Sequence, residues 1–231
     1  MNNLRVFSRL RSWLLILVVL GLIPALRGAT FTVTTNADAG PGSLRQSLLD
    51  AATNAGADTI TFSPTLSGAT ILLTNGELVL NKNLFIDASA LPGGLQLNGN
   101  GSRIFVLAGG YTVVLNSLAM RGHAFEGGAI FNSGALTLNH CTISGCRAQV
   151  GGGILNEGSL TLNSSTVSGN FANSGIGGIL NRGTILLNYS IVSGNVADSV
   201  GGGIDNIGTL TMNGSTVSSN TSGNFGQGRR I

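Results

Sequence analysis

The chain has 231 residues, of which 42% are hydrophobic and only 9% are charged, with 36 glycines and two cysteines. Its mean hydropathy of +0.35 excludes disorder for most of the chain, because a disordered region combines low hydrophobicity with high charge. The glycines follow no three-residue period and the cysteines are few, which excludes collagen and disulfide-rich miniproteins, while abundant Gly, Thr, Ser and Asn favours an all-β protein.

Residues 1–28 have the layout of a secretory signal peptide. Three arginines precede an apolar run from Trp13 to Ile23, and small residues follow around Gly28 and Ala29. The run is shorter than the about 20 apolar residues of a transmembrane helix, so we expect no membrane span after the signal is removed. Removal takes away four arginines and changes the net charge from +3 to −1, with eight basic and nine acidic residues left. This balance, without a basic patch among aromatic residues, disfavours a nucleic-acid partner.

Residues 30–62 predict an N-terminal cap in which a short helix lies between two alternating strands. The strands are expected at Phe31–Thr35 and Thr59–Phe62. The helix is expected over residues 43–52, where Ser43 and Gln46 have the spacing of a capping box. The residues singled out at its start are Ser43, Leu44, Arg45 and Gln46. Because the first coil of a solenoid has an unpaired edge, an amphipathic helix across that end would protect it.

Residues 63–220 predict a parallel β-helix, because four segments of this region repeat. The clearest is GGGILNEGSLTLNSSTVSGN from Gly151, and the first asparagines of successive segments are 24, 25 and 25 residues apart. Apolar residues alternate within each segment, which indicates short strands. Three strands fit one segment, at Gly153–Asn156, Ser159–Asn163 and Ser165–Ser168. A period of about 25 residues with three strands is typical of one β-helix coil.

Asparagines recur at the corners of these coils, where stacking places equivalent residues about 4.8 Å apart. An amide stacked on the same amide in the next coil can both donate and accept a hydrogen bond. We therefore predict structural asparagine ladders. Their members are Asn132, Asn139, Asn156, Asn163, Asn170, Asn181, Asn188, Asn195, Asn206, Asn213 and Asn220.

The segment from Phe31 to Phe62, FTVTTNADAGPGSLRQSLLDAATNAGADTITF, resembles the N-terminal segment of bacterial secreted proteins named for a Cys-Ser-Leu-Arg-Glu-Ala motif. Here the motif reads GSLRQS over residues 42–47, so three of its six positions match. The repeats are similar to those of right-handed parallel β-helix surface proteins, including polymorphic outer-membrane proteins, whose GGAI signature occurs at Gly127–Ile130. The resemblance implies a right-handed, pectin-lyase-like solenoid that is secreted or held at the outer envelope of a bacterium.

The competing interpretation is a polysaccharide-active enzyme or a glycan-binding protein, because pectate lyases and polygalacturonases share this architecture. Glycoside hydrolysis commonly needs two carboxyl groups about 5 to 10 Å apart. The acids after residue 100 do not fall in one column of adjacent coils, and Glu157 aligns instead with Arg182, which predicts an exposed ion pair. We predict no catalytic residue, no metal site and no cofactor.

The basic and imidazole side chains leave an alternative open. Lys82 is the only lysine, and three arginines, at positions 103, 121 and 147, lie in successive coils at non-equivalent registers, so a modest anion-binding strip is the weaker hypothesis. The alignment puts His123 on a ladder column and His140 in a turn at the position of Ser164. Neither has a partner arranged as a catalytic triad.

Cys141 and Cys146 align with Ser165 and Asn170 of the next coil. Five residues apart across a corner, they are predicted to be unpaired, with a local disulfide or metal site as the alternative. Residues 221–231 read as a polar tail without a cap, so we expect self-association through the last coil. The sequence thus favours a non-catalytic structural, adhesion or binding module with a surface glycan or protein as its partner.

Overall fold

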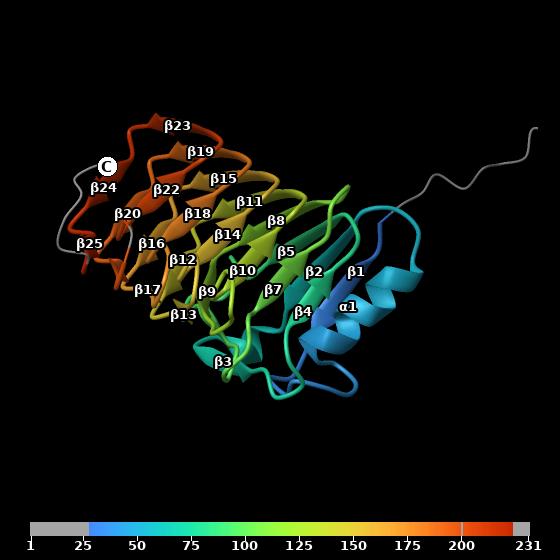
Figure 1. Cartoon of the computed structure of the whole chain (residues 1–231). Helices are drawn as coiled ribbons and strands as arrows, with labels where there is room; N and C mark the ends of the chain where they lie inside the picture. Colours follow the sequence, from blue (N-terminus) through green and yellow to red (C-terminus); the bar gives the residue numbers. More distant parts are fainter. Residues whose placement is uncertain (1–27, 200, 224–231) are drawn as a thin grey trace, which may run out of the picture.

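The computed structural model describes residues 28–199 and 201–223, which form a parallel β-helix whose coils stack along one axis (Figure 1). The predicted all-β solenoid fold is therefore confirmed. Almost all of the predicted signal peptide lies outside the described residues, as does the end of the predicted tail, residues 224–231. In the described ranges, no helix is long and apolar enough to cross a membrane.

The longest sheet has eight parallel strands, one for each successive winding of the chain. They are β1 (Thr30–Val33), β2 (Asp58–Phe62), β5 (Leu84–Asp87), β8 (Thr112–Asn116), β11 (Ala135–Asn139), β15 (Ser159–Asn163), β19 (Thr184–Asn188) and β23 (Thr209–Asn213). Equivalent residues face each other: Leu138 pairs with Leu162, and Leu162 with Leu187. Because the pairing holds this register, the alternating leucines all point inward.

Two further sheets complete most of each coil. One contains β4 (Leu78–Leu80), β7 (Phe105–Leu107), β10 (Ile130–Asn132), β14 (Ile154–Asn156), β18 (Ile179–Asn181) and β22 (Ile204–Asn206). The other contains β3 (Ala69–Leu72), β6 (Leu95–Asn98), β9 (Leu118–Arg121), β12 (Thr142–Ser144), β16 (Thr166–Ser168), β20 (Ile191–Ser193) and β24 (Thr216–Ser218). The 3₁₀ helix η1 (Pro64–Leu66) precedes β3.

The later coils contain a fourth short strand that the sequence did not predict. These strands are β13 (Arg147–Ala148), β17 (Phe171–Ala172), β21 (Val196–Ala197) and β25 (Thr221–Ser222). Each has only two residues, which is too short for alternation to mark it. Strand β25 lies beyond residue 220, so solenoid pairing extends into the segment expected as a tail.

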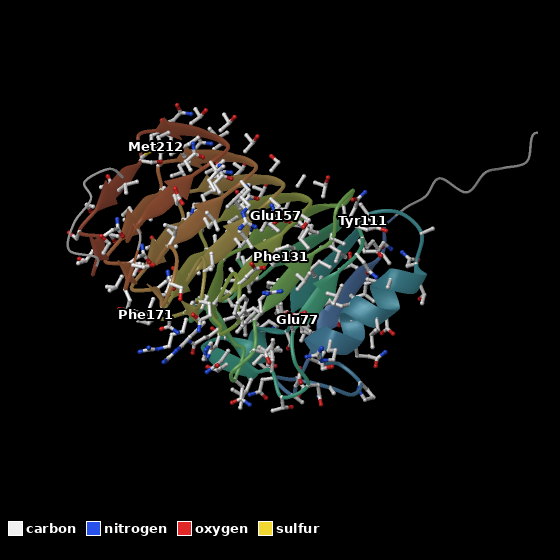
Figure 2. The ribbon with its side chains drawn as sticks, in the orientation of Figure 1. Glu77, Tyr111, Phe131, Glu157, Phe171 and Met212 are labelled. Carbon is white, nitrogen blue, oxygen red and sulfur yellow. The ribbon has the colours of Figure 1, made fainter. Side chains whose placement is uncertain are left out.

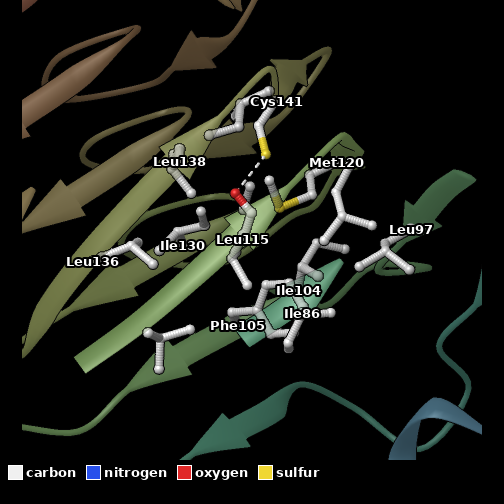
Figure 3. Close-up of a cluster of buried hydrophobic side chains, with 14 of the residues drawn as sticks. Ile86, Leu97, Ile104, Phe105, Leu115, Met120, Ile130, Leu136, Leu138 and Cys141 are labelled. Carbon is white, nitrogen blue, oxygen red and sulfur yellow. Dashed lines mark hydrogen bonds between the residues drawn. The ribbon is translucent and has the colours of Figure 1, made fainter. Parts of the chain in front are cut away.

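The main apolar core runs through the inside of the solenoid, and Leu155, Ile176 and Leu180 form a second, smaller buried cluster. Figure 3 shows part of the main core, where Phe105, Leu115, Met120 and Ile130 from neighbouring coils lie in one cluster. These four side chains are fully buried or nearly so. Cys141 lies in the same cluster, with its Sγ 3.4 Å from the carbonyl oxygen of Leu115. The thiol therefore fills core volume and donates to a main-chain acceptor.

The helix α1 (Leu44–Thr53) packs against β1 and β2 at the N-terminal end of the solenoid (Figure 1). The Ser43 Oγ accepts a hydrogen bond from the Gln46 amide at 3.1 Å, which caps the helix. The Gln46 side chain turns to Asp50 instead of completing the capping box. Because β1 and β2 are the first two strands of the eight-stranded sheet, the cap is continuous with the solenoid.

A column of glycines allows the coils to approach closely. It comprises Gly134, Gly158, Gly183 and Gly208, each two residues after a ladder asparagine. A Cβ atom on Gly183 would lie 2.0 Å from the carbonyl oxygen of Gly158, which is far inside van der Waals contact. The recurring Asn-x-Gly of the sequence thus joins a buried amide to a corner with no room for a side chain.

Candidate functional site

The first asparagine ladder follows β10, β14, β18 and β22. The Nδ2 of Asn132 donates to the Oδ1 of Asn156 at 2.6 Å, and Asn156 donates in the same way to Asn181 at 2.7 Å. Asn181 continues the column to Asn206 at 2.6 Å. The first three side chains are fully buried, and main-chain carbonyls such as Thr184 O accept their remaining donors. The column thus satisfies polar groups that would otherwise be costly to bury.

Two other columns of asparagines are joined by the same amide-to-amide hydrogen bonds between coils. The column of Asn139, Asn163, Asn188 and Asn213 is closer to solvent, and its last three amides donate toward the preceding coil, as from Asn188 to Asn163 at 2.8 Å. In the buried third column, Asn170 donates to Asn195, and Asn195 to Asn220, both at 2.9 Å. All eleven asparagines singled out from the sequence lie in these columns, and their hydrogen bonds give them a structural role.

Arg45, the arginine of the motif in the cap, joins the helix to the first coils. Its guanidinium contacts the Asp38 carboxylate at 2.9 Å and donates to the Gly76 carbonyl oxygen at 2.6 Å. Burial by itself raises the pKa of the Asp38 carboxyl. Hydrogen bonds from the Asn75 amide, Arg45 and the Thr74 amide outweigh this effect and hold the pKa below its usual value of 3.8. This arrangement fixes the cap to the first coils.

Lys82 and Asp58 form a second buried contact under the cap. The ammonium group of Lys82 donates to Asp58 and to two carbonyl oxygens at the end of α1, those of Ala51 and Asn54. Burial raises the pKa of the Asp58 carboxyl, but the Lys82 hydrogen bond and donors from Ala29 and Asn54 lower it by more, so the net pKa lies below 3.8. The cation also complements the negative end of the helix dipole.

Two further acids pair with arginines on the surface. Glu157 accepts from Arg182 at 3.1 Å, as the repeat alignment predicts, and Glu77 accepts from Arg103 at 3.2 Å. Both pairs are exposed on at least one side, so each contributes little to stability, about 0 to 1 kcal/mol. Over residues 28–199 and 201–223, no cluster of three or more His, Cys, Asp or Glu side chains has the arrangement to hold a metal ion.

Cys141 and Cys146 are both buried and unpaired. The Cys141 amide donates to the Ser165 Oγ and the Cys146 amide to the Asn170 Oδ1, both at 3.0 Å, so the thiols stand in the Ser165 and Asn170 columns. Burial raises the pKa of each thiol to about 11. Such thiols are poor nucleophiles at neutral pH.

His123 lies elsewhere than the repeat alignment predicts. Met120 pairs with Ile143, an offset of 23 residues, whereas His123 pairs with Arg147, an offset of 24. The turn after β12 holds one more residue than the turn after β9, so Gly122 stands beside the Cys146 column and His123 is exposed. The assignment of His123 to a ladder was therefore wrong. His140 occupies a turn with φ 52°, as Ser164 does with φ 47°.

The shifted turn creates a cleft that sequence reasoning missed. Its volume is about 310 Å³, and its lining residues are Asn98, Asn100, Gly101, Arg121, Gly122, His123, Gly145 and Arg147. The repeat alignment had placed Arg121 and Arg147 at non-equivalent registers, which is correct, but adjacent registers in neighbouring coils still open onto one cleft. The cleft lies where β6, β9 and β12 end and β13 begins.

The scan against protein-family models and the search of curated proteins each gave no match for this chain.

Proposed function

We propose that the chain is an exported, non-catalytic β-solenoid that serves at the cell surface or outside the cell as a structural, adhesion or binding module. The layout of residues 1–28 supports export. The motif around Arg45 and the GGAI signature at Gly127–Ile130 support kinship with bacterial secreted proteins that carry the Cys-Ser-Leu-Arg-Glu-Ala segment and with polymorphic outer-membrane proteins.

The observation that carries the proposal is that most acidic side chains are engaged by polar groups of the chain itself. Six of the nine acids in the sequence make side-chain contacts of this kind: Asp38, Asp50, Asp58, Glu77, Asp87 and Glu157. A hydrolase or lyase keeps its carboxylates directed at substrate. Here Asp38 and Asp58 of the cap are instead buried against the basic groups of Arg45 and Lys82, which supports a rigid scaffold over a catalyst.

A combined binding and product assay tests the non-catalytic part. The purified chain is incubated with polygalacturonate and with neutral dextran, and each sample is examined for bound protein, reducing ends and unsaturated products. We expect retention on the acidic polymer with no product above a heat-denatured control. Product that grows with protein concentration would overturn the proposal in favour of a pectin-lyase-like enzyme.

Export is tested with the full chain in a bacterial host. We expect a shortened protein in the periplasm or medium, beginning near Ala29 by intact mass. A chain that stays in the cytoplasm and keeps residues 1–28 would overturn this part.

We also propose self-association through the last described coil. Strands β22, β23, β24 and β25 are each the last in their sheet among the described residues, and Ile207 and Met212 of this coil are 67% and 40% exposed. Strand edges that no other described strand pairs with present main-chain donors and acceptors to a second copy. Light scattering of the wild type should give an average mass above that of one chain, and the Met212→Lys variant should give a lower average mass. A single-chain mass at high concentration would contradict it.

A further inference from the structure

Two basic side chains of the described solenoid lack a carboxylate partner, and both line the cleft at the β12–β13 turn. Of the six lysines and arginines within residues 28–199 and 201–223, four form ion pairs: Arg45, Lys82, Arg103 and Arg182. The other two are Arg121 and Arg147. The structure thus gathers its uncompensated positive charge in one place.

Three successive coils build this cleft. The first contributes Asn98 and Asn100, the second Arg121 and His123, and the third Arg147. Side chains with N–H groups therefore converge on a space of about 310 Å³, which is the lower end of the range for small-molecule sites. No acid is among the lining residues.

Neighbouring contacts hold the basic groups in position. The guanidinium of Arg147 lies 5.1 Å from the centroid of the Phe171 ring, a cation–π contact with the next coil. The Arg147 amide donates to the Gly122 carbonyl oxygen at 3.1 Å, which fixes the strand beside His123. Arg121 is the last residue of β9 and lies against Gly145. Such anchoring lowers the ordering cost of binding.

We propose that this cleft binds the carboxylate or sulfate group of an acidic polysaccharide. A guanidinium presents N–H donors in a planar fork that matches a planar or tetrahedral oxyanion. Two of them make a site of positive potential, and the imidazole of His123 adds an N–H donor. The choice of a polysaccharide as the ligand's source rests on the proposed function, whereas oxyanion binding rests on the cleft alone.

Aromatic side chains beside the cleft favour a sugar polymer over a free ion. Phe125 follows His123 by two residues and is 72% exposed. Phe171 extends the same edge, where β13 and β17 lie, and Figure 2 labels it there. The exposed ring of Phe125 and the half-buried ring of Phe171 provide apolar area for the body of a ligand whose charged group is held by the arginines.

The test compares binding of dextran sulfate, polygalacturonate, neutral dextran and single-stranded DNA to the full mature chain by calorimetry at low salt. Dextran sulfate or polygalacturonate should bind, and the tighter of the two identifies the anionic group. We expect Arg121→Gln and Arg147→Gln each to weaken that binding roughly tenfold or more. The matched control is Arg182→Gln, which removes an exposed arginine outside the cleft and should leave affinity within about twofold.

Several results would overturn the site. They are failure of both acidic polymers to bind, equal binding of neutral dextran, equal or tighter binding of DNA, or unchanged affinity in both cleft variants. Circular dichroism and melting of the variants should match the wild type, because both arginines are exposed. Binding of inorganic sulfate separates the two proposals. If sulfate competes with the polymer for the wild-type chain but not for the cleft variants, the oxyanion site is supported even if the chain proves to be an enzyme or is not exported.

Discussion

Asn156 donates from Nδ2 to the Oδ1 of Asn181 at 2.7 Å, although 25 residues separate the two along the chain. Both side chains are fully buried, and the same amide of Asn156 also donates to main-chain oxygens of Gly158 and Thr184. The Asn156 side chain therefore joins its own coil to the next and donates hydrogen bonds to a main-chain oxygen in each. Because the contact repeats from coil to coil, the ladder can form only where successive coils have nearly equal length and stack in register.

Replacing Asn156 by alanine should remove this link and lower the free energy of unfolding by about 3 kcal/mol, since buried partners above and below lose hydrogen bonds. The matched control is Asn213→Ala in the last described coil, where the side chain is exposed and loses one inter-coil bond to Asn188. Its expected effect on the free energy of unfolding is below about 1 kcal/mol. Urea unfolding of the two variants measures the difference. Equal losses would mean that the buried column does not stabilise the stack.

The Gly183→Ala substitution should lower the free energy of unfolding by about 3 kcal/mol or prevent folding, because the new Cβ would lie 2.0 Å from a main-chain oxygen of the preceding coil. Gly169 provides the comparison, since it has φ +62° and nothing within 4 Å of its Cβ position. Asparagine tolerates this backbone conformation, so Gly169→Asn should lower the free energy of unfolding by less than about 1 kcal/mol. Thermal melting and circular dichroism distinguish them, and a well-folded Gly183→Ala protein with wild-type melting would contradict the close approach.

Acid should destabilise the cap through Asp38 and Asp58. Both carboxyls have a folded pKa below 3.8, so their contribution to stability is complete above the unfolded pKa of about 3.9 and is lost as the pH falls through the lower folded pKa. Unfolding free energy should therefore be flat from pH 7 to 5 and fall below about pH 4.

The free energy of unfolding of the Asp58→Asn variant should be about 3 kcal/mol lower at pH 7, because the substitution leaves Lys82 buried without its charge partner. Its free energy of unfolding should also depend less on pH below about pH 4. Asp50→Asn, on the exposed side of the helix, is the control and should behave like the wild type. An unchanged acid profile in Asp58→Asn would contradict the assignment.

The two thiols should be inert in the folded protein. Burial raises the pKa of Cys141 and Cys146 to about 11, so little thiolate exists at pH 8 and a reagent cannot reach it. A thiol-specific chromogenic reagent should titrate no cysteine under native conditions and two in denaturant without reductant. Fast native labelling would contradict the burial, and no thiol in denaturant would reveal a disulfide.

The repeat length predicted the β-helix because period-two alternation and a 25-residue spacing are both local in the sequence. Sequence reasoning could also align Glu157 with Arg182, since no insertion lies between their coils. It misplaced His123, because the turn after β12 is one residue longer than the turn after β9, and a single shift moves a side chain to another column. The cleft depends on that shift, so only the folded chain brings Arg121 and Arg147 to one site.

The stacking of coils in register is tested most directly by distances between spin labels along the eight-stranded sheet. Thr59, Thr137 and Thr211 share one outward column, with three strand intervals between neighbours of this set. In a background with both cysteines replaced by serine, labels at positions 59 and 211 should be about 29 Å apart, and labels at 137 and 211 about half as far, given about 4.8 Å per strand. Narrow distributions in this two-to-one ratio are the predicted result. A broad distribution, or two separations that do not scale with the number of intervals, would contradict the stacked solenoid.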